Sequence, residues 1–272
     1  MQDAMGDRMK EFEGIETGQR FIPLLPIVVR LDGRSFSSYT KWMERPYDVL
    51  MSRTMIETTK ALVRETNAVI GYTQSDEITL ILYSDAFDSE IWFDGKKQKM
   101  ISCLASFCSV TFYRLICEAN PEKKTAPLPT FDCRAYNAPS KTEAVNAVLW
   151  REKDATKNAI SSAARSLYSH KDIEGKTGSE KQEMLFAKGV NFNKYPAAFK
   201  RGTFIQRRKV VRTFTKDELE VLPPKHKARK DPDLKIERTD VVELEMPSFS
   251  KVINRVEVIF DGADPVTDWE KL

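Results

Sequence analysis

Residues 26–33 read PIVVRLDG, and residues 68–77 read AVIGYTQSDE. Each segment contains a short apolar run rich in β-branched residues, which predicts a buried strand. Each also ends in carboxylates, Asp32 in the first segment and Asp76 with Glu77 in the second. A buried strand has no packing reason to end in bare carboxylates, because charged side chains are rarely buried unless they are paired. We therefore interpret the two segments as halves of one site.

The order of the expected elements explains how these halves meet. The patterns predict, in chain order, strand 26–31, helix 46–66, strands 68–72 and 78–83, helix 100–119 and strand 130–136. That order is the split βαβ or ferredoxin-like arrangement, the geometry of a polymerase palm. Its first and third strands lie side by side in an antiparallel sheet, so Asp32 and Asp76 should come together. The predicted fold class is α+β, with the helices of the palm on one face of the sheet.

The rest of the chain is expected to elaborate this core. Residues 1–22 are predicted to form a lead-in broken by Gly14 and Gly18, residues 142–168 a long or broken helix, and residues 179–188 a helix capped by Ser179. Strands at 202–214 and 241–246 are expected to flank a basic loop at 223–232, the best candidate for disorder. We predict a palm-like catalytic core at 1–137 and an elaboration at 138–272 that packs on it and is not an independent domain.

The composition is that of a soluble globular protein, with 41% apolar and 31% charged residues among 272. No apolar run approaches the roughly 20 residues of a membrane span. The first residues are too polar for a signal peptide. We expect a cytoplasmic protein with no membrane partner.

The available side chains limit the kind of metal site. The chain has two histidines, His170 and His226, and its four cysteines include no Cys-x-x-Cys pair. Oxygen ligands are left, and these favour magnesium or manganese. The candidate ligands are Asp32, Asp76 and the carbonyl of Gly33. Glu77 is a third candidate carboxylate, whose side chain should point away from that of Asp76.

The turn after the first strand offers a phosphate site. Backbone amides in residues 33–37 could cradle phosphates, and Arg45 and Lys99, near the ends of the two helices, could neutralise them. Asp-Gly and Ser-Asp-Glu are also common in ordinary solvated turns. From the residues alone, both interpretations stay open.

A basic stretch in the second half is the candidate RNA surface. Residues 188–216 contain nine Lys or Arg and no Asp or Glu, with aromatic residues between them. This composition fits phosphate binding, and the alternative is a solvated charged face. The candidate RNA contacts are Lys200, Arg201, Arg207, Arg208 and Lys209.

Four segments together are specific to one family. Residues 30–36 (RLDGRSF), 72–77 (YTQSDE), 131–134 (FDCR) and 200–203 (KRGT) occur in this order. They closely resemble the tRNA-histidine guanylyltransferase family and its guanylyltransferase-like relatives, the 3′-to-5′ polymerases. The resemblance covers roughly residues 8–210.

The resemblance implies an enzyme that adds nucleotides to the 5′ end of tRNA after activation of the 5′-phosphate with ATP or GTP. It implies two magnesium ions, a homotetramer, and metal ligands at Asp32, Gly33 and Asp76. Our candidate catalytic carboxylates are Asp32, Asp76 and Glu77, and the sequence does not assign the task of Glu77. It also implies a nucleotide site formed by Asp32, Gly33, Arg34, Ser35, Phe36, Ser37, Arg45, Ser75, Asp76 and Lys99.

Two departures bear on the branch of the family. The eukaryotic guanylyltransferases carry His-Ile-Asn-Asn where residues 156–159 here read TKNA, and histidine where this chain has Ser37. We therefore favour the bacterial and archaeal-type role, templated repair of truncated tRNA 5′ ends. The alternatives are a dedicated tRNA-histidine guanylyltransferase that adds guanosine at position −1, a nucleotide cyclase or ordinary 5′-to-3′ palm polymerase, and a non-catalytic RNA-binding protein.

Overall fold

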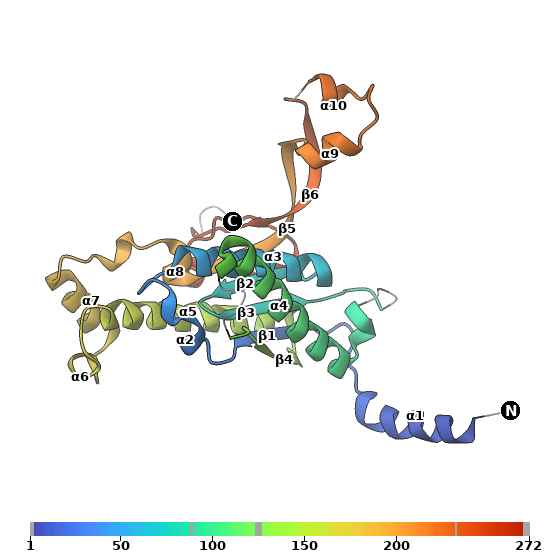
Figure 1. Ribbon diagram of the computed structural model, residues 1–272, viewed down its shortest axis with the longest axis horizontal. Coiled ribbons are helices and arrows are strands. Elements are labelled where there is room, and N and C mark those ends of the chain that lie inside the picture. The colour runs from blue at the N-terminus through green and yellow to red at the C-terminus, as the bar shows by residue number, and fades with distance from the viewer. Residues whose placement is uncertain (1–2, 88, 90, 123–126, 232, 269–272) are drawn as a thin grey trace.

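The computed structural model describes residues 3–268 apart from 88, 90, 123–126 and 232. Its centre is one antiparallel sheet in the order β4-β1-β3-β2-β5-β6 (Figure 1). The strands are β1 (Ile27–Gly33), β2 (Ile70–Gln74), β3 (Glu77–Leu82), β4 (Phe131–Asn137), β5 (Thr203–Thr213) and β6 (Lys235–Glu243). The first and third strands are neighbours, as predicted. In this register Asp32 lies opposite Glu77 of β3 and opposite Asp132 of β4.

One face of the sheet is covered by α3 (Val49–Thr66) and α4 (Lys97–Ala119). Asp48 caps α3 by accepting a hydrogen bond from the amide of Met51, so the helix begins three residues later than the expected Pro46. The odd-numbered side chains of β1, such as Val29 and Leu31, are buried in the core on this side. Successive side chains of a strand point to opposite faces of the sheet, so Asp32 lies on the face opposite to these core residues.

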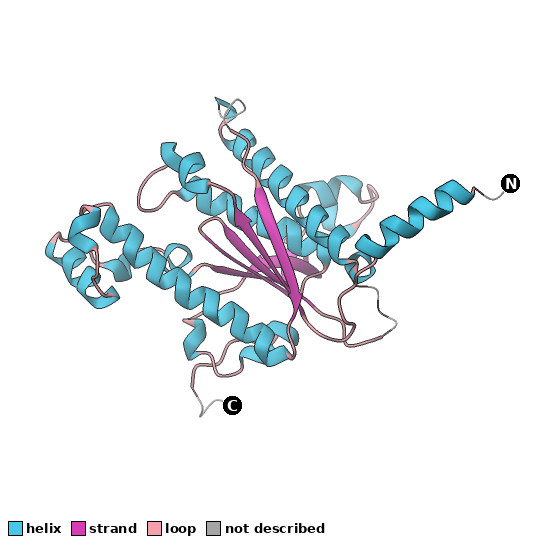
Figure 2. Cartoon of the chain, turned by 90° about the horizontal axis from the view of Figure 1, so that it is seen from below, coloured by secondary structure: helices cyan, strands magenta, loops and turns pink. Residues whose placement is uncertain are grey.

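The opposite face is covered by α5 (Lys141–Arg165) and α11 (Arg255–Phe260), and Figure 2 shows the long helix α5 crossing the sheet. Val28 of β1 packs here with Val148 of α5 and with Phe204 and Phe249 from the second half of the chain. Because β5 and β6 also extend the same sheet, the two halves share one core. The predicted long helix is a single continuous one.

By length and composition, α4 could cross a membrane. This corrects the expectation that no apolar segment approaches that length. In the structure its Leu104, Cys108 and Phe112 are buried in the core beside α3 and β4. A helix in a protein core can be as apolar as a membrane span, because burial inside a protein also selects apolar residues.

Several segments project from this body (Figure 1). At the N-terminus, α1 (Ala4–Thr17) continues through Gly14 and ends at Gly18, so only the second of the two expected glycine breaks occurs. Beyond the sheet, β5 and β6 form a two-stranded ribbon with α9 (Lys216–Val221) and α10 (Lys227–Lys230) at its tip. Of these two helices, α10 lies within the loop at 223–232 that we expected to be disordered. Residue 232 lies outside the described residues.

Short elements complete the chain. They are α2 (Phe36–Tyr39), η1 (Thr40–Trp42), η2 (Trp92–Gly95), α6 (His170–Ile173), α7 (Gly178–Ala187), η4 (Phe192–Lys194), α8 (Ala197–Arg201) and η5 (Phe249–Lys251). The cap of α7 is Thr177, whose hydroxyl accepts from the amide of Glu180, whereas we expected Ser179. The Glu180 carboxylate accepts from the amide of Thr177, which completes the capping box two residues earlier.

Phe249→Ala tests the shared core. Phe249 is fully buried against Phe204, with ring centroids 5.0 Å apart. We expect the free energy of unfolding to fall by about 3–5 kcal/mol through the lost contacts and the cavity. Chemical denaturation followed by circular dichroism measures it. Phe87→Ala, at a side chain 80% exposed, is the matched control and should change little. Two separate unfolding transitions in the wild type would contradict a common core.

Candidate active site

The turn between β2 and β3 carries Asp76 to the end of β1. Ser75 occupies the left-handed backbone region (φ 54°), and its hydroxyl donates to the Asp76 carboxylate over 3.0 Å. The amide of Gly33 donates to the carbonyl of Asp76 over 3.0 Å. Asp32 and Asp76 line the same cleft, of about 550 Å³. The structure therefore brings together the two carboxylates that the sequence placed 44 positions apart.

Burial raises the pKa of Asp76, the hydrogen bond from Ser75 opposes the rise, and the nearby charge of Asp32 adds to it. Two carboxylates of like charge in one partly buried cleft disfavour each other's ionised form. A cation between them would remove that penalty.

The turn after β1 is shaped by Phe36. Its ring packs against Phe112 and Phe131, and a Cβ on Gly33 would lie 2.4 Å from the ring of Phe36. Only glycine leaves room for the ring beneath the strand end. The amides of Gly33 and Arg34 donate to the carbonyls of Asp76 and Thr130. They are therefore engaged within the fold, and the predicted phosphate turn is limited to the amides of residues 35–37.

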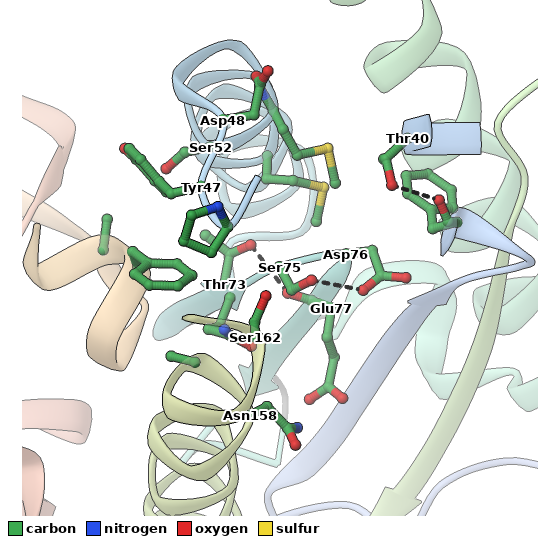
Figure 3. Close-up of a pocket in the computed structure, with 18 of the residues that line it drawn as sticks. Thr40, Tyr47, Asp48, Ser52, Thr73, Ser75, Asp76, Glu77, Asn158 and Ser162 are labelled. Atoms are coloured by element: carbon green, nitrogen blue, oxygen red, sulfur yellow. Dashed lines mark hydrogen bonds between the residues drawn. The ribbon is translucent and has the colours of Figure 1, made fainter. Parts of the chain in front are cut away.

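Glu77 points away from Asp76, as Figure 3 shows, and is held by two arginines. Arg151 of α5 donates to both carboxylate oxygens, over 2.5 and 2.7 Å, and Arg30 of β1 donates over 3.0 Å. Burial raises the pKa of Glu77, while Arg151 and Arg30 oppose the rise. Both oxygens of Glu77 are thus engaged in charge-assisted hydrogen bonds with arginines. The ion-pair group joins α5 to the sheet beside Asp32.

The helix α5 forms one wall of the cleft, a position that was not predicted from the sequence. Asn158 and Ser162 face the cleft below the Ser75 turn (Figure 3). The lining residues on this helix are Arg151, Asp154, Asn158, Ala159, Ser162 and Arg165. Apart from Ala159, they follow one another at a spacing of three or four residues, which makes one polar stripe along the helix. The stripe is visible in the sequence, but its meaning depends on which side of α5 packs on the sheet.

The predicted basic residues fall into different places. Arg45 lines the cleft, where its guanidinium donates to the carbonyl and hydroxyl of Thr40. Lys99 does not join this site. It lies at the start of α4, 4.7 Å from the ring centroid of Phe93, in a hollow lined also by Leu82 at the far end of β3. The start of α4 lies near Leu82 at one end of β3, and Asp76 precedes the other end of that strand. Lys99 is therefore distant from Asp76.

The candidate RNA contacts also separate. Arg207 donates to the carbonyl of Arg64 and to the side chain of Asn67, and Arg208 donates to the carbonyls of Gly262 and Ala263. Successive side chains of a strand alternate between faces, so Arg207 and Arg208 cannot share one surface. Lys209 is exposed beside Glu237. The other two, on α8, are Lys200, which donates to the carbonyl of Asn193, and Arg201, which lines a hollow beside Glu152.

Comparison with known proteins identifies the family. The model of the tRNAHis guanylyltransferase family matches residues 6–139. An uncharacterized protein of Acanthamoeba polyphaga mimivirus is 33% identical over 62% of this chain and 64% of its own length, just under two thirds. The tRNA(His) guanylyltransferase of Saccharomyces cerevisiae is 30% identical over 71% of this chain and 87% of that protein.

The fold agrees with solved structures of a bacterial tRNA(HIS) guanylyltransferase-like protein. Its complex with ATP has a TM-score of 0.76 at 30% identity and covers 95% of this chain and 98% of that one. Its complex with GTP has a TM-score of 0.70 at 29% identity, with coverage of 92% and 95%. The chain belongs to the tRNAHis guanylyltransferase family. It is therefore a nucleotidyltransferase, which confirms the predicted enzyme class.

Arg151→Ala tests the ion-pair group at Glu77. The change removes two of three charged hydrogen bonds from a carboxylate whose side chain is mostly buried. We expect the free energy of unfolding to fall by about 3–5 kcal/mol, the usual cost of breaking a buried ion pair. Equilibrium denaturation with urea measures it.

Arg114→Ala is the control, because Arg114 pairs with Glu118 on the exposed side of α4. Such exposed pairs contribute about 0–1 kcal/mol. Equal losses in the two variants would show that Glu77 is not held as described.

Proposed function

We propose that this protein adds nucleotides in the 3′-to-5′ direction to the 5′ end of tRNA, and that it repairs truncated ends by copying the opposite strand. The observation that carries the proposal is the cleft in which Asp32, Asp76 and the polar stripe of α5 meet. The relatives support it, since the bacterial protein of the same fold binds ATP and GTP. The substrates are then tRNA and nucleoside triphosphates.

Two magnesium ions are the proposed cofactors. The carboxylates of Asp32 and Asp76 and the carbonyl of Gly33 would hold them, and the facing like charges of the two aspartates fit a cation. Within the described part of the chain, no group of three or more His, Cys, Asp or Glu could bind a metal. In the proposal, water and the phosphate oxygens of the substrate would complete the coordination. Bound magnesium supplies charge neutralisation at phosphates and a lowered pKa for an attacking hydroxyl.

The chain's own residues bind and orient the reactants. Arg45 and the amides of residues 35–37 are placed to hold a triphosphate, and Ser75 fixes the carboxylate of Asp76. In the proposed sequence, the 5′-phosphate attacks the α-phosphate of ATP or GTP, which forms the activated 5′ end and releases pyrophosphate. The 3′-hydroxyl of the next nucleoside triphosphate then attacks that phosphate and displaces the activating nucleotide. Glu77 contributes by holding Arg30 and Arg151 beside Asp32.

Repair is favoured over dedicated guanosine addition by the residues of this cleft. Ser37 lines it where the eukaryotic enzymes have histidine, and residues 156–159 replace their His-Ile-Asn-Asn on α5. Of that segment, Asn158 and Ala159 line the cleft. The second candidate function, addition of guanosine at position −1, uses the same carboxylates.

The wider setting completes the proposal. We regard residues 1–137 as a ferredoxin-like palm and residues 138–272 as a part that does not fold alone, since its Phe204 and Phe249 are buried in one cluster with Val28 of the palm. The enzyme acts in the cytoplasm as a homotetramer. Its exposed cations Arg207 and Lys209 on β5, with Lys200 and Arg201 on α8, contact RNA, and Arg208 braces the segment at Gly262.

Asp32→Asn and Asp76→Asn should each lower nucleotide addition more than about 100-fold. Each change removes one anionic ligand of a cation that contributes several kcal/mol to the transition state. Single-turnover incorporation of labelled nucleotide measures the rate. Asp217→Asn, at an exposed aspartate on α9, is the control and should keep the wild-type rate. Full activity in either cleft variant would remove these carboxylates from the reaction.

Repair predicts which tRNA is extended. With magnesium, ATP and all four nucleoside triphosphates, a tRNA that lacks its first nucleotides should be extended to full length, with each added nucleotide complementary to the opposite strand. Sequencing of the labelled products measures this. A control tRNA with an intact 5′ end should take up little label. Exclusive addition of guanosine to intact histidine tRNA would instead support the second function.

A further inference from the structure

Two large aromatic side chains lie exposed on the α5 side of the sheet. Trp150 of α5 is 57% exposed and Tyr136 of β4 is 48% exposed. Tyr136 lies opposite Val28 in the β1–β4 register, and Val28 is buried against α5, so Tyr136 shares that face of the sheet. Much of the apolar surface of both rings is therefore open to contact.

Both aromatics flank the ion-pair group beside the cleft. The guanidinium of Arg151 lies 4.6 Å from the ring centroid of Trp150, and its nitrogens bind Glu77. On the other side of Glu77, Arg30 donates to the same carboxylate. Arg30 lies opposite Arg134 in the register of β1 and β4, two residues along β4 from Tyr136 and on the same face of the sheet. Tyr136 and Trp150 thus lie at the two ends of a mostly buried group, Arg30, Glu77 and Arg151, that lines the cleft.

One exposed arginine, ion-paired with Asp132, lies on the same face of the sheet. Arg134 lies opposite Arg30 in the register of β1 and β4, and its side chain is 61% exposed, 3.4 Å from Asp132. An exposed arginine between an aromatic ring and a catalytic cleft offers a fork of donors to phosphate. Aromatic rings beside a cationic track are the usual platform for unpaired bases.

We propose that Trp150 and Tyr136 form a stacking platform for the unpaired nucleotides of the RNA strand opposite the reacting 5′ end, with Arg134 on their phosphates. The inference rests on the proposed function, because only a templated reaction leaves such nucleotides beside the cleft. Tyr136 lies four strand residues from Asp132, the register partner of Asp32, or about 13 Å along the sheet. That is the length of roughly four stacked nucleotides.

The test compares two RNAs that differ in the length of the unpaired opposite strand, one and four nucleotides. Trp150→Ala and Tyr136→Ala should each raise the KM for the four-nucleotide RNA about tenfold, since stacking of one base changes affinity by about 5- to 150-fold. The KM for the one-nucleotide RNA and kcat should change less than about twofold. Trp150→Phe should restore most of the affinity, because a ring is kept.

Phe186→Ala, at a 68% exposed ring on α7, is the matched control and should bind both RNAs as the wild type does. Thermal unfolding shows that the variants are folded. An equal change for both RNAs, or none, would overturn the platform. If the wild type incorporates no nucleotide, the proposed function fails, and fluorescence anisotropy of the same labelled RNAs still tests the platform by Kd. Unchanged Kd in both alanine variants would overturn it and leave this surface for a protein partner.

Discussion

A single backbone hydrogen bond, from the amide of Gly33 to the carbonyl of Asp76, joins the two segments on which the site depends. It extends the antiparallel pairing of β1 and β3 by one step beyond the last paired residues and fixes the Asp76 turn against the strand end. The ring of Phe36 lies beneath it and excludes any side chain at position 33. The position of the two aspartates is thus a property of the sheet, and it does not rely on a mobile loop.

Hydrogen bonds from Arg151 to Glu77 connect the second half of the chain to the site. The Glu77 carboxylate binds Arg30 of the sheet and Arg151 of α5 at once, so the helix that carries Asn158 and Ser162 is tied to the strand that carries Asp32. Mostly buried charges of this kind are stable only when they are paired. This explains why residues beyond 138 matter to a cleft whose two neighbouring aspartates, Asp32 and Asp76, precede them. It also shows which side chains Glu77 binds, which the sequence alone left open.

Much of this could be predicted because it follows from local pattern. The β-branched runs and the two apolar helices determined the strand order, and hence that Asp32 and Asp76 would meet. The predicted helix starts were less accurate, as at Asp48 for α3 and Thr177 for α7, because several residues within a few positions can each cap a helix. The strand β6 was expected to start at 241, yet it begins at Lys235, because a projecting ribbon exposed on both faces has no apolar alternation to read.

Other features depended on tertiary packing. Lys99 looked like a partner of the cleft from its motif position, but the direction of α4 places it at the far end of β3. The polar stripe of α5 could have been counted at helical spacing, but only the packed face shows that it lines the cleft. Arg207 and Arg208 read as one basic patch until strand alternation separated them.

The central claim is that Asp32 and Asp76 act as one oxygen-ligand site. The most direct measurement is binding of Mn²⁺, in the presence of GTP, by electron paramagnetic resonance in the wild type, in Asp32→Asn, in Asp76→Asn and in the double variant. A shared site predicts that each single change weakens Mn²⁺ binding strongly and that the double change adds much less than the sum of the two. Unaltered Mn²⁺ binding in the single variants, or strictly additive losses, would contradict it.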